Sequence, residues 1–167
     1  KDRVVESIGK TYMCHYPTKG YCSARNSKRS ALHEKLAANS AYFRDVSGWE
    51  SPMFYADMQP EHSFAKENYF DAWKGEHEAC RNDVALIDMS FMSKFLVQGR
   101  DAGAFLNMLS TAVVDGEVGK ITYTQWLDEW GKMQADLTVT KMDDDKFMVV
   151  ATDTMHRHVE THMKRRL

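Results

Sequence analysis

The chain has 167 residues, enough for one compact domain with a substantial core. Its 22 basic and 24 acidic residues nearly balance, so charge gives no reason to expect a nucleic-acid partner or a membrane surface, and no apolar run reaches transmembrane length. The cysteines are odd in number and lack metal-ligand spacing, which argues against a disulfide framework and favours a reducing compartment; they are Cys14, Cys22 and Cys80.

The first part of the chain, residues 1–68, holds all three prolines and has an irregular composition. Its one clear helical pattern covers residues 30–38, where Ser30 is a candidate N-cap. A strand is expected over residues 41–43, and a turn over residues 47–52 follows it.

From residue 68 onward the patterns become regular. Apolar residues three and four apart predict an amphipathic helix over residues 69–81, with Phe70, Trp73 and His77 facing a core. The sequence therefore predicts an α+β fold in which antiparallel strands are flanked by helices. The further elements expected are strands over 85–89, 94–97 and 147–151, a helix over 102–109 capped by Asp101, and a C-terminal helix from about residue 154 that buries Met155, Val159 and Met163.

The stretch over residues 120–140 predicts a β-hairpin around a turn at 128–131. In its second strand Met133, Ala135, Leu137 and Val139 fall on one face, and Asp136 falls on the polar face. A four-residue loop would set Tyr123 directly opposite Asp136.

Asp136 is unusual because Asp disfavours strands, yet it lies within a run of good strand formers. A solvated surface residue is the simpler interpretation of such an acid. The alternative is a functional site, since local departures from propensity occur most often there.

Other chemical signatures are missing or incomplete. His158 and His162 stand four apart, as zinc ligands would, but no third ligand is apparent, so we expect exposed helix histidines and no metal site. The sequence has neither a dinucleotide-binding fingerprint nor a phosphate-binding loop.

Residues 86–95, 122–125 and 134–140 resemble the folate-binding domain of the aminomethyltransferase family. This family includes the glycine-cleavage T-protein and the C-terminal parts of sarcosine and dimethylglycine dehydrogenases. Residues 3–9, 14–17 and 47–52 are similar to the region that precedes this domain in the dehydrogenases, so the resemblance points to that branch. It implies a connecting region over residues 1–60 and the N-terminal part of the folate-binding domain over 61–167.

The resemblance implies a one-carbon reaction. A flavin domain oxidises an N-methyl amine to an iminium, and tetrahydrofolate captures the one-carbon unit as methylenetetrahydrofolate. Asp136 would then steady the cation and accept a proton, Met92 would pack on the pterin side, and Tyr123 would line the folate pocket. FAD would bind only through a domain absent from this chain. The implied partners are that flavin domain and the C-terminal half of the folate domain, in the mitochondrial matrix or, alternatively, the bacterial cytoplasm.

The chain also departs from the family pattern. Lys132 stands where the family usually has a second glycine in the hairpin turn, which would strain the turn if that position needs a positive φ. A second hypothesis is therefore a truncated, non-catalytic relative that acts as a structural or regulatory subunit. Without further segments we expect Met133, Leu137 and Val139 to remain partly uncovered.

Overall fold

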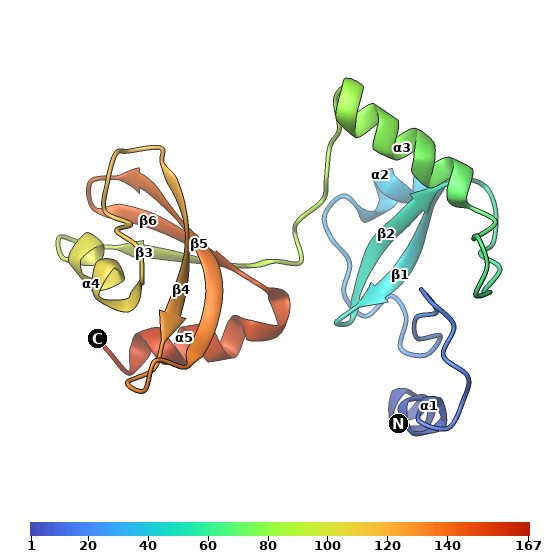
Figure 1. Ribbon diagram of the computed structural model, residues 1–167, viewed down its shortest axis with the longest axis horizontal. Helices are drawn as coiled ribbons and strands as arrows, with labels where there is room; N and C mark the ends of the chain where they lie inside the picture. The colour runs from blue at the N-terminus through green and yellow to red at the C-terminus, as the bar shows by residue number, and fades with distance from the viewer. The chain divides into compact units, whose positions relative to one another are not determined.

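The computed structural model describes residues 1–167, which form two compact units, unit 1 over Lys1–Ser90 and unit 2 over Phe91–Leu167 (Figure 1). Each unit combines helices with its own antiparallel sheet, which confirms the predicted α+β class. None of the helices has both the length and the apolarity that a membrane crossing requires. Unit 1 contains α1 (Asp2–Lys10), α2 (His33–Ala38), β1 (Ala41–Val46), β2 (Trp49–Tyr55) and α3 (Phe70–Asn82); unit 2 contains β3 (Ser93–Gln98), α4 (Ala102–Leu109), β4 (Ile121–Leu127), β5 (Met133–Asp143), β6 (Lys146–Ala151), the 3-10 turn η1 (Asp153–Met155) and α5 (His156–Lys164).

The sheet of unit 1 is the hairpin β1–β2, closed by Ser47 and Gly48. Both turn residues have positive φ, 52° and 86°, as expected for a tight hairpin turn whose twist matches that of the strands. The turn predicted over 47–52 was therefore too long. Pro52 lies within β2 beside an irregularity in the ladder, which is a position where a strand tolerates proline.

Stacked aromatic rings form the interior of unit 1. The ring centroids of Tyr42 and Phe54 lie 5.1 Å apart, and those of Phe54 and Tyr69 lie 4.4 Å apart. Trp73 meets Tyr69 edge-on, and its indole N–H donates to the carbonyl of Met53 at 2.6 Å. These contacts attach the first turn of α3 to β2.

Helix α3 agrees closely with the helix predicted over 69–81, but its predicted core face was wrong. No residue of α3 is buried, and Phe70 and His77 are exposed. A two-stranded sheet offers little area for a helix to cover, so α3 contacts it through few residues, among them Trp73 and Glu76, whose carboxylate accepts the backbone N–H of Tyr55 at 2.8 Å.

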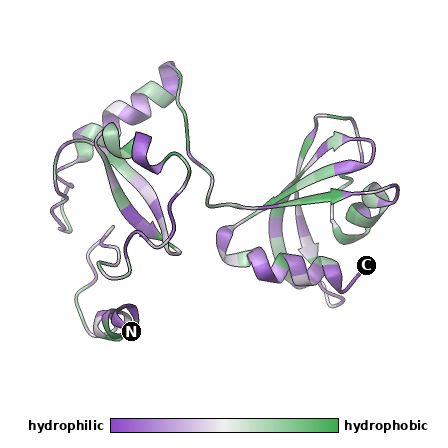
Figure 2. Ribbon diagram, turned by 180° about the vertical axis from the view of Figure 1, so that it is seen from behind, coloured by the Kyte–Doolittle hydropathy of each residue, from purple (hydrophilic) through white to green (hydrophobic).

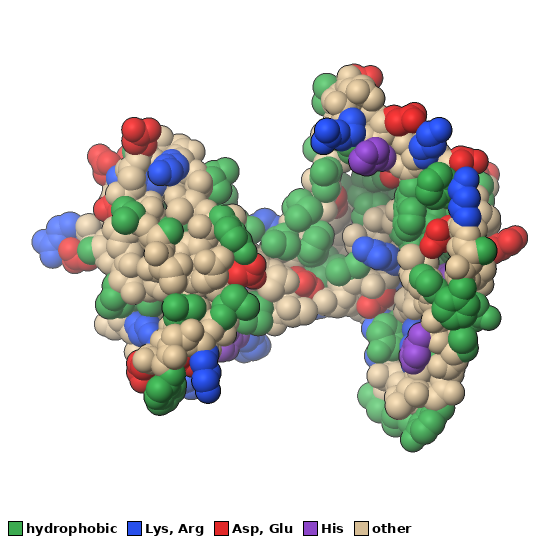
Figure 3. All heavy atoms as spheres, viewed as in Figure 1, with side chains coloured by type: hydrophobic (Ala, Val, Ile, Leu, Met, Phe, Trp, Pro, Cys, Tyr) green, Lys and Arg blue, Asp and Glu red, His purple; other side chains and the backbone are tan.

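The N-terminal helix α1 was not predicted. Its polar side chains attach it to unit 1: Arg3 pairs with Asp45 at 3.0 Å, and the carboxylate of Glu6 accepts the backbone N–H of Cys22 at 2.7 Å. Its apolar residues point outward and are exposed, as Figure 3 shows over α1; they are Val4, Val5 and Ile8.

Helix α2 begins three residues later than predicted, because the hydroxyl of Ser30 accepts the backbone N–H of Leu32 in a local turn and does not cap the helix.

Unit 2 is a four-stranded antiparallel sheet in the order β3-β6-β5-β4. Helices α4 and α5 cover one face, which we call the inner face, and form the core with its side chains. The opposite, outer face carries no helix. In Figure 2, hydrophobic and hydrophilic residues alternate along these strands, as expected for a sheet with one buried face. The core consists of Ala102, Leu106, Leu109, Val114, Trp126, Ala135, Leu137, Val139, Phe147, Val149, Ala151, Val159 and Met163.

Several predictions for unit 2 are confirmed, among them β3, α4, β6 and the C-terminal helix. The strand predicted over residues 85–89 was wrong, because this segment is irregular and belongs to neither sheet. Asp101 precedes α4 but makes no side-chain cap, and its carboxylate pairs with Arg100. The expectation of uncovered core residues fails for Leu137 and Val139, which α4 and α5 help to bury, although Met133 is exposed.

Candidate functional site

The candidate site lies on the hairpin β4–β5, whose loop is tighter than predicted. The backbone N–H of Asp128 donates to the carbonyl of Lys132 at 2.9 Å, so only residues 129–131 form the loop. Gly131 occupies the left-handed region at φ 77°, whereas Lys132 is not among the residues of positive φ. This is a known three-residue hairpin geometry with glycine at its left-handed position. Lys132 is therefore accommodated without the strain considered from the family pattern.

The carboxylate of Asp128 holds this loop together. Its Oδ1 accepts the backbone N–H groups of Trp130 and Lys132, both at 2.9 Å, and its Oδ2 accepts the side-chain amide of Gln134 at 3.1 Å. These donors favour the ionised form and lower the pKa of Asp128, the backbone N–H of Lys132 having the largest effect.

The register of the hairpin differs from the prediction by two residues. Tyr123 lies opposite Thr138, and Gln125 lies opposite Asp136. The three-residue loop accounts for one residue of this shift, and a bulge in β5 next to the loop accounts for the other. Because the shift is even beyond the bulge, Ala135 to Thr140 keep their predicted faces, whereas Met133, on the loop side of the bulge, pairs with Leu127 and is exposed.

Tyr123 and Asp136 nevertheless meet on the outer face of the sheet. The phenol of Tyr123 donates to Oδ2 of Asp136 at 2.8 Å, across the diagonal between the two strands. Both residues are exposed, with 62% of Tyr123 accessible. The other carboxylate oxygen of Asp136, Oδ1, has no partner in the chain, so it is open to a ligand.

Apolar and polar side chains share the outer face around this pair. One row across the sheet contains Lys94, Val150, Thr138 and Tyr123, and the next contains Leu96, Met148, Thr140 and Ile121. Leu96 and Ile121 are exposed, and Met148 and Val150 are half-buried. The outer face thus combines a carboxylate, a phenol and a flat apolar area, which suits a planar ligand that carries both polar and apolar edges.

Met92 is the third residue that the resemblance assigned to the site. It is half-buried and directly precedes Ser93, which pairs with Ala151, which in turn pairs with Leu137. Met92 and Asp136 each directly precede a member of this row, so they lie at the same level across the sheet. Two strand spacings, or about 10 Å, separate them. The structure brings Tyr123 and Asp136 into contact but does not bring Met92 to either.

The histidines of α5 do not form a metal site. The rings of His158 and His162 are 6.2 Å apart, and no group of three or more His, Cys, Asp or Glu residues is arranged to hold a metal ion. The expectation of two exposed histidines holds for His158 but was wrong for His162, which is only 6% exposed and stacks on Trp126.

The fold matches that of a solved aminomethyltransferase. The crystal structure of glycine cleavage system aminomethyltransferase T from Bartonella henselae superposes with a TM-score of 0.68 at 24% identity, over 83% of this chain and 35% of that chain. The family model for the GCVT N-terminal domain matches residues 32–167. The chain therefore belongs to the GCVT N-terminal domain family.

Two curated relatives match the chain beyond this domain. The 4-methylaminobutanoate oxidase (formaldehyde-forming) of Paenarthrobacter nicotinovorans is 34% identical over 169 residues, which cover 99% of this chain and 20% of that protein. The mitochondrial sarcosine dehydrogenase of Homo sapiens is 29% identical over 170 residues, which cover 85% of this chain and 18% of that protein. The chain thus spans about a fifth of the length of these relatives.

Proposed function

We propose that this chain is the folate-binding segment of an FAD-dependent demethylating dehydrogenase that acts on sarcosine, dimethylglycine or a similar N-methyl amine. In this proposal FAD belongs to another domain of the same enzyme, and tetrahydrofolate binds to the outer face of unit 2. The remainder of the folate domain and the flavin domain are the partners. The proposed compartment is the mitochondrial matrix, with the bacterial cytoplasm as the alternative; the name of the human relative calls that protein mitochondrial.

The observation that carries the proposal is the exposed pair of Tyr123 and Asp136 on an apolar sheet face. An exposed Asp within a strand contributes little to folding, so its presence needs another reason. Oδ1 of Asp136 is available as a hydrogen-bond acceptor, and the half-buried and exposed apolar residues beside it offer a surface for a flat ring. These features fit a pterin, which has a polar edge and a planar ring.

Asp136 has two tasks in this proposal. When bound, tetrahydrofolate supplies the nitrogens that accept the one-carbon unit. The carboxylate of Asp136 stabilises positive charge that develops beside those nitrogens and receives the proton released when the unit is transferred. Tyr123 holds the carboxylate in one orientation by donating to Oδ2, which keeps Oδ1 directed to the ligand. Met92, two strand spacings from Asp136, would contact another part of the pterin.

The test uses the enzyme expressed from its complete gene and follows flavin reduction, methylenetetrahydrofolate and free formaldehyde side by side. Asp136→Asn keeps the shape of the side chain but removes its charge. We expect methylenetetrahydrofolate formation to fall about a hundredfold to a thousandfold, as for the loss of one preorganised electrostatic contact, while formaldehyde rises. Flavin reduction by the amine, at a separate site, should change less than about tenfold.

Two further variants separate the pair from general effects. Tyr123→Phe removes only the hydrogen bond to Asp136 and should lower methylenetetrahydrofolate formation by about tenfold. Asp145→Asn removes an exposed charge from the β5–β6 turn of the same sheet and should have no effect. If Asp136→Asn forms methylenetetrahydrofolate at the unaltered rate, or the unaltered enzyme shows no folate dependence, the proposal fails and the non-catalytic subunit becomes the better hypothesis.

A further inference from the structure

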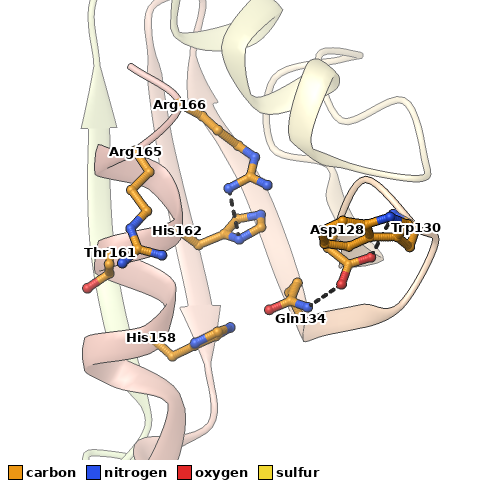
Figure 4. A pocket seen from close by; sticks show the side chains of 8 residues that line it. All are labelled: Asp128, Trp130, Gln134, His158, Thr161, His162, Arg165 and Arg166. Atoms are coloured by element: carbon orange, nitrogen blue, oxygen red, sulfur yellow. Dashed lines mark hydrogen bonds between the residues drawn. The ribbon is translucent and has the colours of Figure 1, made fainter.

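A cavity of about 240 Å³ separates the C-terminal part of α5 from the loop of the β4–β5 hairpin (Figure 4). This is many times the volume of about 10–15 Å³ that one bound water needs, so the cavity has room for a small organic molecule. The helix contributes His158, His162, Arg165 and Arg166, and the hairpin contributes Trp130 and Asp128 on the other side.

The helix side of the cavity carries unpaired positive charge. Neither Arg165 nor Arg166 forms an ion pair with a carboxylate of the chain, whereas the neighbouring Lys164 pairs with Glu160 at 2.6 Å. An arginine presents a planar set of N–H donors that matches two oxygens of a carboxylate or a phosphate. Two such groups at one cavity therefore define a surface suited to an anion.

His162 is the buried member of this set. It is only 6% exposed, and Figure 4 shows its ring directed from α5 toward the hairpin loop. Nδ1 of His162 lies 3.3 Å from Nη1 of Arg166; because a guanidinium only donates, Nδ1 accepts and the proton of the neutral ring lies on Nε2. That Nε2 is buried and has no hydrogen-bond partner within the chain. A buried donor without an acceptor is unfavourable, and a small movement of the ring toward the cavity would let a ligand oxygen accept from it.

The hairpin side adds one negative charge to the lining, that of Asp128. Both oxygens of Asp128 already accept hydrogen bonds from the loop itself, from the backbone of Trp130 and Lys132 and from the side chain of Gln134. The lining therefore retains an excess of positive charge, with two guanidiniums against one carboxylate. The indole of Trp130 is 79% exposed at the rim and offers a flat apolar surface to the rest of a ligand.

We infer that this cavity is a binding site for a small organic anion, whose carboxylate or phosphate group is held by Arg165 and Arg166 and whose remaining part lies against Trp130. The site is distinct from the candidate folate surface, since α5 packs on the inner face of the sheet whereas Asp136 lies on the outer face. The inference does not depend on the proposed folate function.

The test titrates the 167-residue chain with inorganic phosphate and, separately, with succinate, and follows binding by calorimetry and by the NMR signals of the His162 ring. We expect saturable binding of at least one anion, with His162 among the most shifted signals. The arms with phosphate and succinate identify which oxyanion the site prefers. The double variant R165Q/R166Q should weaken that binding by about tenfold or more for each guanidinium lost.

The control for charge alone is K164Q, which removes one positive charge from the same helical turn outside the cavity lining. It should leave affinity within about twofold, because nonspecific attraction between exposed charges is weak and screened by salt. Absence of saturable binding, equal loss in the control, or unchanged binding in the double variant would each overturn the inference. Circular dichroism of each variant, at the wild-type intensity, establishes that the fold is retained.

Discussion

At the scale of single residues, hydrogen bonding distinguishes the two acids of the β4–β5 hairpin, Asp128 and Asp136. Tyr123 and Asp136 are exposed, so their hydrogen bond contributes little to stability and its value lies in holding one carboxylate orientation. Asp128 is bound by three donors of its own loop, so it serves the hairpin. Aspartate therefore has a structural role at position 128, whereas at position 136 one of its oxygens is free to bind a ligand.

His162 allows a prediction about pH. Burial lowers its pKa below the usual value, and the positive charges of Arg166 and His158 act in the same direction, while Asp128 opposes them. The unfolded chain therefore binds a proton at pH values where the folded chain does not. Stability is complete above the ordinary histidine pKa of 6.5 and falls as the pH drops from there through the lowered pKa.

Urea unfolding of the chain at pH about 7.5 and about 5.5 measures this effect. We expect the free energy of unfolding to fall on acidification, and H162Q should show a smaller fall even if its absolute stability is lower. H77Q changes an exposed histidine of α3, away from His162, and should keep the unaltered pH slope. A slope in H162Q as steep as that of the unaltered chain would assign the pH dependence to other groups.

At the scale of elements, the hairpin turn depends on one glycine. Gly131 has φ 77°, and an added Cβ would meet no atom within 4 Å, so only backbone strain opposes a side chain there. We expect G131A to lower the free energy of unfolding by about 1–2 kcal/mol. Circular dichroism with urea titration measures this change.

The matched variant K132G restores the second glycine of the family pattern. Because Lys132 has no positive φ to relieve, this variant should not stabilise the chain and should cost up to about 1 kcal/mol through added freedom of the unfolded chain. A gain in stability for K132G would show that Lys132 is strained and would contradict the turn geometry described here.

Local sequence patterns predicted most elements of unit 2 but not their exact pairing. Alternation along β5 correctly assigned Ala135 and Asp136 to opposite faces, because this property depends only on the period of two. The register depended on a bulge and on a three-residue loop, and nothing in the composition distinguished that loop from a four-residue one. The predicted contact of Tyr123 with Asp136 survived because tyrosine is long enough to reach across a diagonal.

The errors elsewhere share a physical reason, since they depend on what an element packs against. The aromatic stripe of α3 has helical spacing, yet the small β1–β2 sheet leaves Phe70 exposed. His162 has the same spacing from His158 as an exposed pair would have, but Trp126 covers it. Helix α1 was missed although Val4, Val5 and Ile8 have helical spacing. No capping side chain marks its start, and its apolar residues are exposed.

At the scale of the whole molecule, the two units have separate interiors. The hydrophobic core of unit 2 contains only residues from Ala102 to Met163, and the aromatic stack of unit 1 runs from Tyr42 through Phe54 and Tyr69 to Trp73. Cooperative unfolding follows shared packing, so separate cores predict separate transitions.

Gly103 provides a marker for one of these transitions. A Cβ at this position of α4 would lie 2.3 Å from Oδ2 and 2.5 Å from Cγ of Asp115. Asp115 has little freedom to retreat, because its other oxygen pairs at 2.9 Å with Lys141, which is itself only 8% exposed. The overpacking should cost about 1–3 kcal/mol within unit 2, of which the better helix propensity of alanine offsets at most about 1 kcal/mol.

Scanning calorimetry of the chain should therefore show two transitions, of which G103A lowers only one. For a unit of this size, a loss of 1 kcal/mol corresponds to a fall in Tm of about 4–8 °C. The control G75A changes a glycine of α3 where an added Cβ meets no atom within 4 Å, so it should leave the unit 2 transition unchanged and, by its better helix propensity, slightly raise that of unit 1. A single transition that shifts as a whole in G103A would mean that the two units unfold as one cooperative body, and the separate cores would then not determine how the chain melts.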